Sequence, residues 1–409
     1  MQYTSGSTGN PKGVIVSHRN IMANQRMICE AFGHSDKTVF VGWLPFHHDM
    51  GLVGNIMQPL YLGIPAVLMS AAAFVQKPVR WLKAISKYKA TTSGGPNFSY
   101  DQCVRRCSDA ELEGLDLSSW KVAFNGAEPV RAETLAQFQA KFQRYGFSSR
   151  SFYPCYGMAE ATLFVAGGVA GSEPVISTFD TAQLEDSSAG AGGAPRARDI
   201  VGCGFGRMGQ KILIVHPETK RPCAPGSIGE IWVSGANIAR NYLRADGAIA
   251  DCFNGRLADT GEGPFLQTGD LGLIHEDNLY VTGRLKELII LRGRNIYPHD
   301  IERSVSDAHP ALHGCEGAAF SVDVDGEEKL VVIHEVSRTY LNKFDTGDIM
   351  SSVRERLAAD HDVGLHDLTL VRPLTIPKTS SGKTQRNLCQ DLYVQRQLLA
   401  LANPGVTAP

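Results

Sequence analysis

A short segment near the start of the chain combines residue types that bind phosphate groups. Residues 4–13 read Thr-Ser-Gly-Ser-Thr-Gly-Asn-Pro-Lys-Gly. Glycines let backbone N–H groups approach oxygen atoms, hydroxyl groups donate hydrogen bonds, and a lysine adds positive charge. A flexible N-terminus is the alternative, and the spacing differs from that of the G-x-x-x-x-G-K-[ST] loop. We predict a phosphate-binding loop whose members are Thr4, Ser5, Gly6, Ser7, Thr8, Gly9 and Lys12.

Other polar residues could do chemistry but carry little weight one at a time. Glu160 follows a helical pattern, where a glutamate is usually a solvated surface charge. Residues 268–270 read Thr-Gly-Asp, which is equally typical of a turn. The adjacent His47 and His48 could be partly buried structural histidines. Their order along the chain therefore matters more than any single residue.

Seven ordered segments resemble the signature motifs of the adenylate-forming superfamily. This superfamily includes acyl-CoA synthetases, luciferases, peptide-synthetase adenylation domains and fatty acyl-AMP ligases. The segments are residues 4–13, 45–51 (PFHHDMG), 125–129 (NGAEP), 156–160 (YGMAE), 268–270 (TGD), 283–286 (GRLK) and 377–383 (PKTSSGK). The resemblance runs from residue 3 to about residue 390. It implies an α/β fold with a layered α/β subdomain, a β-subdomain and a small mobile α+β C-terminal domain.

The resemblance also implies a reaction and a role for each motif. A carboxylate would attack the α-phosphate of ATP, and pyrophosphate would leave. Glu160 and Thr8 would organise Mg²⁺, a hard cation that prefers oxygen ligands. The implied catalytic residues are Lys383, Glu160 and His48, the last in the motif at the acyl pocket. The implied nucleotide-binding residues beyond the phosphate loop are Asn125, Gly126, Ala127, Glu128, Tyr156, Gly157, Asp270 and Arg284, and Lys286 would be the hinge.

Three features resemble the fatty acyl-AMP ligases more than the acyl-CoA synthetases. Residues 156–162 (YGMAEAT) and two other motifs closely resemble the corresponding motif sequences of the fatty acyl-AMP ligases. The run at 174–198 resembles an insertion that restricts the domain motion needed for the CoA step, although an ordinary disordered loop is the alternative. Ile290 stands where many thioester-forming relatives have lysine. The implied acceptor of the acyl group is the phosphopantetheine thiol of an acyl carrier protein.

No charged residue occurs between Leu52 and Gln76. Pro59 and Pro65 argue against a transmembrane segment. We expect a buried helix, a turn at residues 63–65 and a buried strand at residues 66–69. With Trp43, residues 52–75 would line an apolar tunnel for a fatty acid, since burying each CH₂ group gains about 0.8 kcal/mol.

Charge and cysteine content exclude other classes of protein. The 40 basic and 42 acidic side chains give a net charge of −2, which offers no general attraction to nucleic acid. Nine cysteines without a C-x-x-C pair argue against a disulfide framework or a zinc site. A reducing, cytoplasmic setting fits this pattern best.

The chain between the motifs shows how they are positioned. Helical patterns at residues 19–32, 77–87 and 131–142 alternate with apolar runs at 38–44 and 121–124, which predicts a parallel, layered sheet. Short runs between residues 211 and 282 predict an antiparallel β-subdomain. The predicted division is a large domain at 1–285, a small domain at 286–395 and a tail at 396–409. The large domain would comprise an α/β part (1–170), an insertion (171–200) and a β-subdomain (201–285).

One departure from the family is expected to affect activity. In the family a region comparable to a domain precedes the phosphate loop, whereas here the loop begins at Thr4. We expect the isolated chain to expose an apolar face and unpaired strand edges and to be poorly soluble or inactive. A long-chain acyl-CoA synthetase is the alternative enzyme. A non-catalytic remnant that binds an acyl chain or a carrier protein is the alternative of another class.

Overall fold

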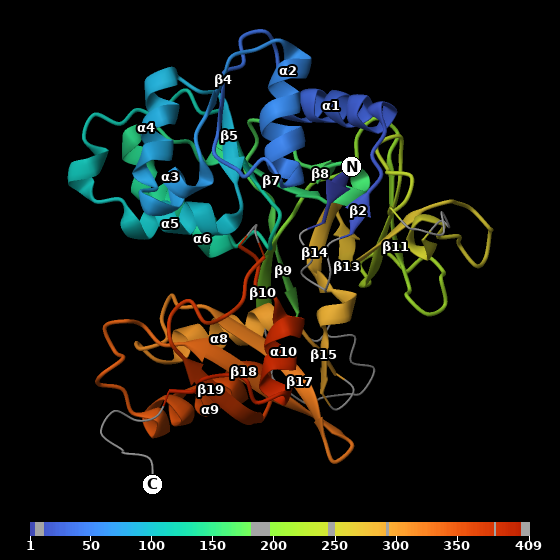
Figure 1. Cartoon of the computed structure of the whole chain (residues 1–409). Coiled ribbons are helices and arrows are strands. Elements are labelled where there is room, and N and C mark those ends of the chain that lie inside the picture. Colours follow the sequence, from blue (N-terminus) through green and yellow to red (C-terminus); the bar gives the residue numbers. More distant parts are fainter. Residues whose placement is uncertain (5–11, 181–196, 244–249, 292–293, 380–381, 402–409) are drawn as a thin grey trace. The chain divides into compact units, whose positions relative to one another are not determined.

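The computed structural model describes residues 1–4, 12–180, 197–243, 250–291, 294–379 and 382–401 (Figure 1). These residues fall into two compact units. The first unit ends at Thr282, and the second begins at Gly283. Each unit buries a hydrophobic core of its own, as expected of a domain.

A six-stranded sheet organises the first unit. Its strand order is β4 (Ala66–Leu68), β3 (Phe40–Gly42), β5 (Thr92–Gly95), β6 (Val122–Asn125), β7 (Phe152–Gly157) and β8 (Phe164–Gly167). The first five strands are parallel, and β8 runs antiparallel to β7. The helices between the strands include α1 (His18–Phe32), α4 (Val79–Tyr88), α5 (Asn97–Arg106) and α6 (Ala132–Phe142). The predicted layered α/β organisation is confirmed, with β8 as the one antiparallel member.

Aromatic side chains fill the layer between this sheet and its helices. Trp81 packs edge-to-face on Tyr100 and Trp120, with ring centroids 5.6 and 5.2 Å apart. Both indoles donate hydrogen bonds to Ser93 on β5, at 2.7 Å to its hydroxyl and 3.1 Å to its carbonyl. Buried tryptophans need such partners for their N–H groups. These contacts hold β5 and its neighbour β6, whose end carries the NGAEP motif.

The uncharged segment is less buried than predicted. It forms a π-helix (Met50–Met57), α2 (Gln58–Leu62), β4 and α3 (Ala71–Gln76). The prediction of a buried strand at residues 66–69 is wrong, because β4 is the edge strand of the sheet and Leu68 is 42% exposed. Leu60 and Val75 are also exposed, which contradicts a tunnel lined by all of residues 52–75. Within the described residues, every helix falls short of the length and apolar character that a bilayer span requires.

The rest of the first unit is β-rich. A four-stranded sheet has the order β11 (Lys211–Val215), β12 (Gly229–Ser234), β13 (Leu266–His275) and β14 (Asn278–Arg284). Antiparallel pairing of β12 with both β11 and β13 confirms the predicted β-subdomain. The predicted insertion begins and ends as an antiparallel ribbon of β9 (Ile176–Asp180) and β10 (Ala197–Val201). Its residues 181–196 lie outside the described residues.

The second unit is a small α+β structure. Strand β18 (Glu327–Glu335) pairs antiparallel with β17 (Gly317–Val324) and parallel with β19 (Leu365–Val371). The hairpin β15 (Ile289–Leu291) and β16 (Arg294–Ile296) precedes α8 (Pro298–Ala308), and α9 (Thr346–His361) and α10 (Arg386–Val394) complete the unit. Residues 402–409 of the predicted tail lie outside the described residues.

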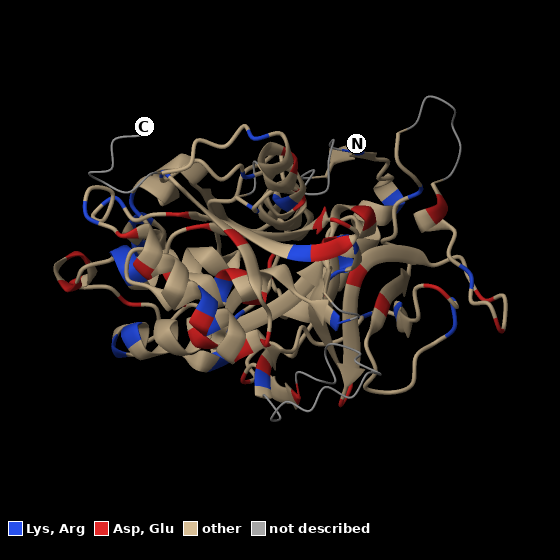
Figure 2. Ribbon diagram, turned by 90° about the horizontal axis from the view of Figure 1, so that it is seen from below, with Lys and Arg blue, Asp and Glu red and all other residues tan. Residues whose placement is uncertain are grey.

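Acidic and basic residues occur close together along the ribbon of the described chain (Figure 2). Several form exposed ion pairs, such as Lys89 with Asp116 at 2.6 Å and Lys77 with Glu111 at 2.9 Å. This mixture agrees with the near-zero net charge of the chain.

Replacing Leu68 by lysine should raise the solubility of the chain without lowering its stability. An edge strand can pair with another chain, and a charged side chain on the edge opposes this. Because Leu68 is 42% exposed, the unfolding free energy should change by no more than about 0.5 kcal/mol. Light scattering and urea unfolding measure the two quantities.

The matched control is Phe74→Ala. Phe74 is completely buried, so its loss should cost about 3–5 kcal/mol. Aggregation of Leu68→Lys at the level of the unmodified chain would show that the β4 edge does not limit solubility.

Candidate active site

The two ends of the predicted phosphate loop are held together. Strands β1 (Gln2–Tyr3) and β2 (Gly13–Val14) pair antiparallel. The Thr4 N–H donates to the Lys12 carbonyl at 2.9 Å, and the Lys12 N–H donates to the Thr4 hydroxyl at 3.0 Å. The Lys12 ammonium lies 4.8 Å from the centroid of the Tyr242 ring, a cation–π distance. The loop members Ser5, Gly6, Ser7, Thr8 and Gly9 lie outside the described residues.

Glu160 lies in a short 3₁₀ turn (Ala159–Ala161) that follows β7. The Tyr242 hydroxyl donates a 2.6 Å hydrogen bond to its Oε1 atom. Burial, assisted by the negative charge of Glu160, raises the pKa of Tyr242 well above its usual range. Tyr242 therefore keeps its proton and remains a hydrogen-bond donor to the carboxylate. Sequence reasoning missed Tyr242.

The turn that carries Glu160 is fixed by its own backbone contacts. Thr162 has φ +69°, an unfavourable conformation for a β-branched residue. Its hydroxyl donates to the Asn237 carbonyl at 2.6 Å, and the Asn237 amide donates to two carbonyls of the turn and β8, at 3.2 and 3.1 Å. The Ala239 N–H donates to the Glu160 carbonyl at 2.8 Å. Surrounding contacts thus impose the strained turn, as at many functional sites.

The structure brings Tyr156 and Asp270 together. The Tyr156 hydroxyl donates to Asp270 Oδ2 at 2.7 Å, and both residues are buried. Tyr156 is the penultimate residue of β7, and Asp270 lies on β13. Next to Tyr156, a Cβ atom on Gly157 would stand 2.0 Å from the Leu163 carbonyl oxygen, so only glycine fits there. The contact joins two motifs that are 114 residues apart.

Glu230 is a second carboxylate that sequence reasoning missed. It is buried on β12, where Oε1 accepts from the Gly269 N–H at 2.9 Å and Oε2 accepts from the Trp232 indole at 2.8 Å. Gly269 has φ +72°, which suits glycine. Glu230 thereby fixes the backbone beside Asp270. Glu230 and Trp232 are two residues apart on β12, so their side chains share one face of the strand.

The NGAEP segment follows the end of β6, and its nucleotide-binding role stays a prediction. Asn125 is completely buried, and its Oδ1 has no hydrogen-bond partner within the described chain. A Cβ atom on Gly126 would approach the Cys155 carbonyl oxygen to 2.7 Å, and Ala127 has φ +68°. Glu128 accepts from the Phe98 N–H at 2.6 Å, at the start of α5. Its carboxylate thus caps a helix.

His48 lies at the start of the π-helix. Its Nδ1 is 2.6 Å from Asp49 Oδ1, which also accepts from the Met50 N–H at 2.7 Å. Asp49 therefore both orients the imidazole and caps the helix. Trp43, expected in the acyl tunnel, stacks on Phe74 with ring centroids 4.0 Å apart and belongs to the core.

A divalent cation fits the residues near the phosphate loop if substrate phosphates supply the other oxygen ligands. No group of three or more His, Cys, Asp or Glu side chains that could hold a metal ion exists among the described residues. Glu160 would supply one carboxylate. Mg²⁺ is commonly held by one or two carboxylates together with substrate phosphates, so a single carboxylate near a phosphate loop suits it.

The remaining predicted residues, Arg284, Lys286 and Lys383, all lie in the second unit. Arg284 ends β14, and Lys286 is exposed in the 3₁₀ turn Leu285–Glu287. Lys383 lies in a tight loop, because the Thr379 N–H donates to its carbonyl at 2.8 Å and its own N–H donates to the Thr379 hydroxyl at 3.1 Å. The lysine is thus held at a defined place just before α10.

A mostly buried ionic cluster joins the turn at residues 285–287 to the segment that follows Lys383. Arg386 donates to both oxygens of Glu302 on α8, at 2.6 and 2.8 Å, and to Glu287 at 2.5 Å. Glu287 follows Lys286, and Arg386 is three residues after Lys383. Paired burial compensates the desolvation of these charges. The sequence did not indicate this cluster.

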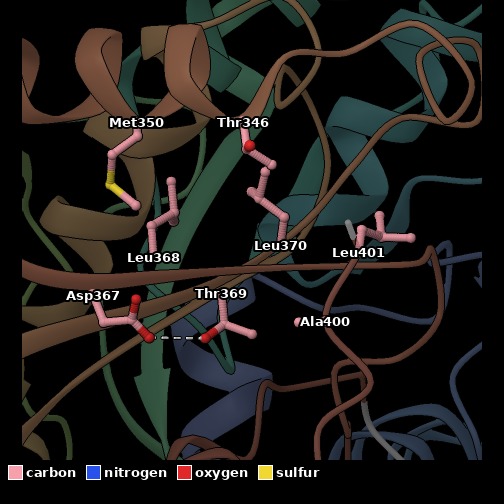
Figure 3. A pocket seen from close by; sticks show the side chains of 8 residues that line it. All are labelled: Thr346, Met350, Asp367, Leu368, Thr369, Leu370, Ala400 and Leu401. Carbon is pink, nitrogen blue, oxygen red and sulfur yellow. Dashed lines mark hydrogen bonds between the residues drawn. The ribbon is translucent and has the colours of Figure 1, made fainter. Parts of the chain in front are cut away.

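The second unit also contains a cavity of about 210 Å³ (Figure 3). Its apolar wall includes Met350 of α9, Leu368 and Leu370 of β19, and Leu401. The eight lining residues include none of the predicted site residues. This cavity is therefore separate from the candidate active site.

Two family descriptions match the chain. Residues 1–243 match the family of AMP-binding enzymes. Residues 286–403 match the AMP domain of Disco-interacting protein 2-like proteins.

Two curated relatives and one solved structure are similar over nearly the whole chain. TtuA of Teredinibacter turnerae, a medium-chain-fatty-acid–[acyl-carrier-protein] ligase, is 47% identical over 95% of this chain and 62% of TtuA. JamA of Moorena producens, a ligase of the same description, is 43% identical over 97% of this chain and 68% of JamA. The fatty acyl-adenylate ligase from L. pneumophila, solved with acyl adenylate and pyrophosphate, is 43% identical with a TM-score of 0.68. That match covers 98% of this chain and 70% of the other. The chain thus spans 62–70% of the length of these proteins.

Replacing Arg386 by alanine should loosen the hinge turn and α10. Glu287 and Glu302 would remain mostly buried without their cation, and breaking a buried pair typically costs about 3–5 kcal/mol. All four tryptophans precede residue 283, so fluorescence reports only the first unit. Hydrogen exchange of peptides covering residues 285–302 and 383–394 should accelerate instead.

Arg356→Ala is the matched control for this variant. Arg356 forms a more exposed pair with Asp360 on α9, which is worth about 0.3–0.5 kcal/mol. Equal exchange in the two variants would show that the Arg386 cluster does not fix the turn.

Proposed function

The chain belongs to the family of AMP-binding enzymes, close to its fatty acyl-AMP ligases, and from this premise we propose that it converts a fatty acid and ATP to acyl adenylate and pyrophosphate. An oxygen of the carboxylate forms a bond to the α-phosphorus of ATP. The bond from that phosphorus to the bridging oxygen of the β-phosphate breaks, and pyrophosphate leaves with the electron pair. Both reactants are anions, so catalysis consists mainly of charge neutralisation and alignment.

One observation carries this proposal. The cation at the end of the phosphate loop and the carboxylate suited to Mg²⁺ meet at one side chain, since Tyr242 contacts both Lys12 and Glu160. This is the arrangement that a triphosphate with its metal ion requires. Bound Mg²⁺ supplies charge neutralisation at the phosphate oxygens. Glu160, with Thr8, holds it in this proposal.

The other residues have separate roles in the proposal. Asp270 accepts hydrogen bonds from the ribose hydroxyls, for which Tyr156 must share or release the carboxylate oxygen that it now occupies. Arg284 donates to the ribose. Asn125 Oδ1 accepts from the adenine amino group. Lys383 donates to the carboxylate and α-phosphate oxygens, with Lys286 as the hinge between domains 1–285 and 286–395.

The acyl group is destined for an acyl carrier protein. TtuA and JamA are described as ligases of medium-chain fatty acids to acyl carrier protein. Ile290, at the position where the resemblance implies lysine in many thioester-forming enzymes, is 53% exposed on β15. An apolar exposed side chain there gives CoA phosphates no cation to contact.

The test is pyrophosphate release with ATP, Mg²⁺ and a medium-chain fatty acid, with and without CoA. The proposed function predicts pyrophosphate release and acyl adenylate without acyl-CoA, against the sequence-based expectation that the isolated chain is inactive. Lys383→Ala should lower the rate about 10²–10³-fold, because it removes a donor to the reacting oxygens, while ATP binding changes little. Acyl-CoA formation would instead favour an acyl-CoA synthetase, and no release would favour a non-catalytic remnant.

Lys378→Ala is the matched control. Lys378 lies in the same segment as Lys383, and its ammonium pairs with Glu316 at 2.7 Å. Loss of this partly exposed pair should change the rate by less than about threefold. Equal losses in both variants, or loss of ATP binding in Lys383→Ala, would contradict the role given to Lys383.

A further inference from the structure

Tyr242 occupies an unusual position because its backbone and side chain contact three separate pieces of the candidate site. Its backbone lies in a bridge with Val14 on β2, the strand that closes the phosphate loop. The next residue, Leu243, donates its N–H to the Gly13 carbonyl at 2.6 Å. The segment around Tyr242 is therefore paired with the end of the loop through an isolated antiparallel bridge.

The side chain of Tyr242 is fixed on two further sides. Its ring packs edge-to-face on Phe253, with centroids 5.1 Å apart. Its hydroxyl donates to Glu160 at 2.6 Å, and the Lys12 ammonium lies over the ring face. A ring held by backbone pairing and by an aromatic neighbour has little freedom, so it can impose a geometry on the groups that it contacts.

We propose that Tyr242 is a positioning residue that aligns the Glu160 carboxylate for a divalent cation and places the Lys12 ammonium beside the same phosphates. The proposal rests on the function proposed above. The hydroxyl acts through Glu160, and the ring acts through Lys12. The two actions separate chemically because phenylalanine removes only the first and leucine removes both.

The hydroxyl controls the metal dependence. Removing a hydrogen-bond partner of a metal-binding carboxylate typically weakens metal affinity about 10–100-fold. Tyr242→Phe should therefore raise the Mg²⁺ concentration needed for tight ATP binding by that factor, with near-normal ATP affinity at saturating Mg²⁺. Tyr242→Leu should show the same metal effect and, in addition, about two- to fivefold weaker ATP binding at saturating Mg²⁺, since the cation–π contact is lost.

The experiment is calorimetric titration of the full chain with ATP at a series of Mg²⁺ concentrations, without fatty acid. Tyr280→Phe is the matched control. It deletes the hydroxyl of a buried tyrosine in the same unit, where the partner is Ser177 at 2.7 Å, and it should leave the Mg²⁺ dependence unchanged. Thermal unfolding midpoints of the two phenylalanine variants check that both fold.

A double variant tests whether the hydroxyl acts through Glu160. In Glu160→Gln the metal-binding carboxylate is already lost, so adding Tyr242→Phe should change the Mg²⁺ dependence by less than about twofold. An equal loss in both backgrounds would overturn the positioning role. A wild-type Mg²⁺ dependence in Tyr242→Phe would overturn it as well. An unmodified chain that binds no ATP would overturn the proposed function, and this inference with it.

Discussion

Burial of carboxylates is the constraint around which the functional segments are organised. A carboxylate removed from water must be paired or hydrogen-bonded, because its desolvation is otherwise very costly. Asp270 and Glu230 are buried in the first unit. Asp270 accepts a hydrogen bond from a tyrosine hydroxyl, and Glu230 accepts one from an indole and one from a backbone N–H. Glu302 in the second unit is paired to Arg386. Each carboxylate thereby gains one fixed orientation.

Fixed orientation matters because each carboxylate joins distant segments. Glu160 and Tyr242 are 82 residues apart, and Tyr156 and Asp270 are 114 residues apart. The β-subdomain thus supplies a partner to the end of the six-stranded sheet at Asp270, while segment 240–243 supplies a partner to the turn at Glu160. The strained Thr162 beside that turn is tolerated because Asn237 holds the backbone from the other side.

The sequence predicted local secondary structure and missed contacts between side chains that are far apart along the chain. Period and turn residues placed α1 and α6 to within one residue and predicted the antiparallel β-subdomain between residues 211 and 282. Exposure of β4 was missed because an apolar run does not distinguish an edge strand from a central one. The partners Tyr242, Glu230 and Arg386 were missed because an isolated tyrosine, glutamate or arginine gives no signal of the residue that it meets. Glu128 belongs to a motif, and the sequence did not indicate that its carboxylate also accepts from the Phe98 N–H at the start of α5.

Paired charges also fix the segment around Lys383 in the second unit. Arg386 connects Glu287, next to the hinge residue Lys286, with Glu302 on α8, and it follows Lys383 by three residues. The Thr379 contacts close the loop on itself. The ionic cluster links the turn at residues 285–287 to α8 and α10, so we expect these elements to move together if the proposed hinge at Lys286 rotates. Such coupling would let a change at the hinge reposition Lys383, as expected of a residue that aligns reactants.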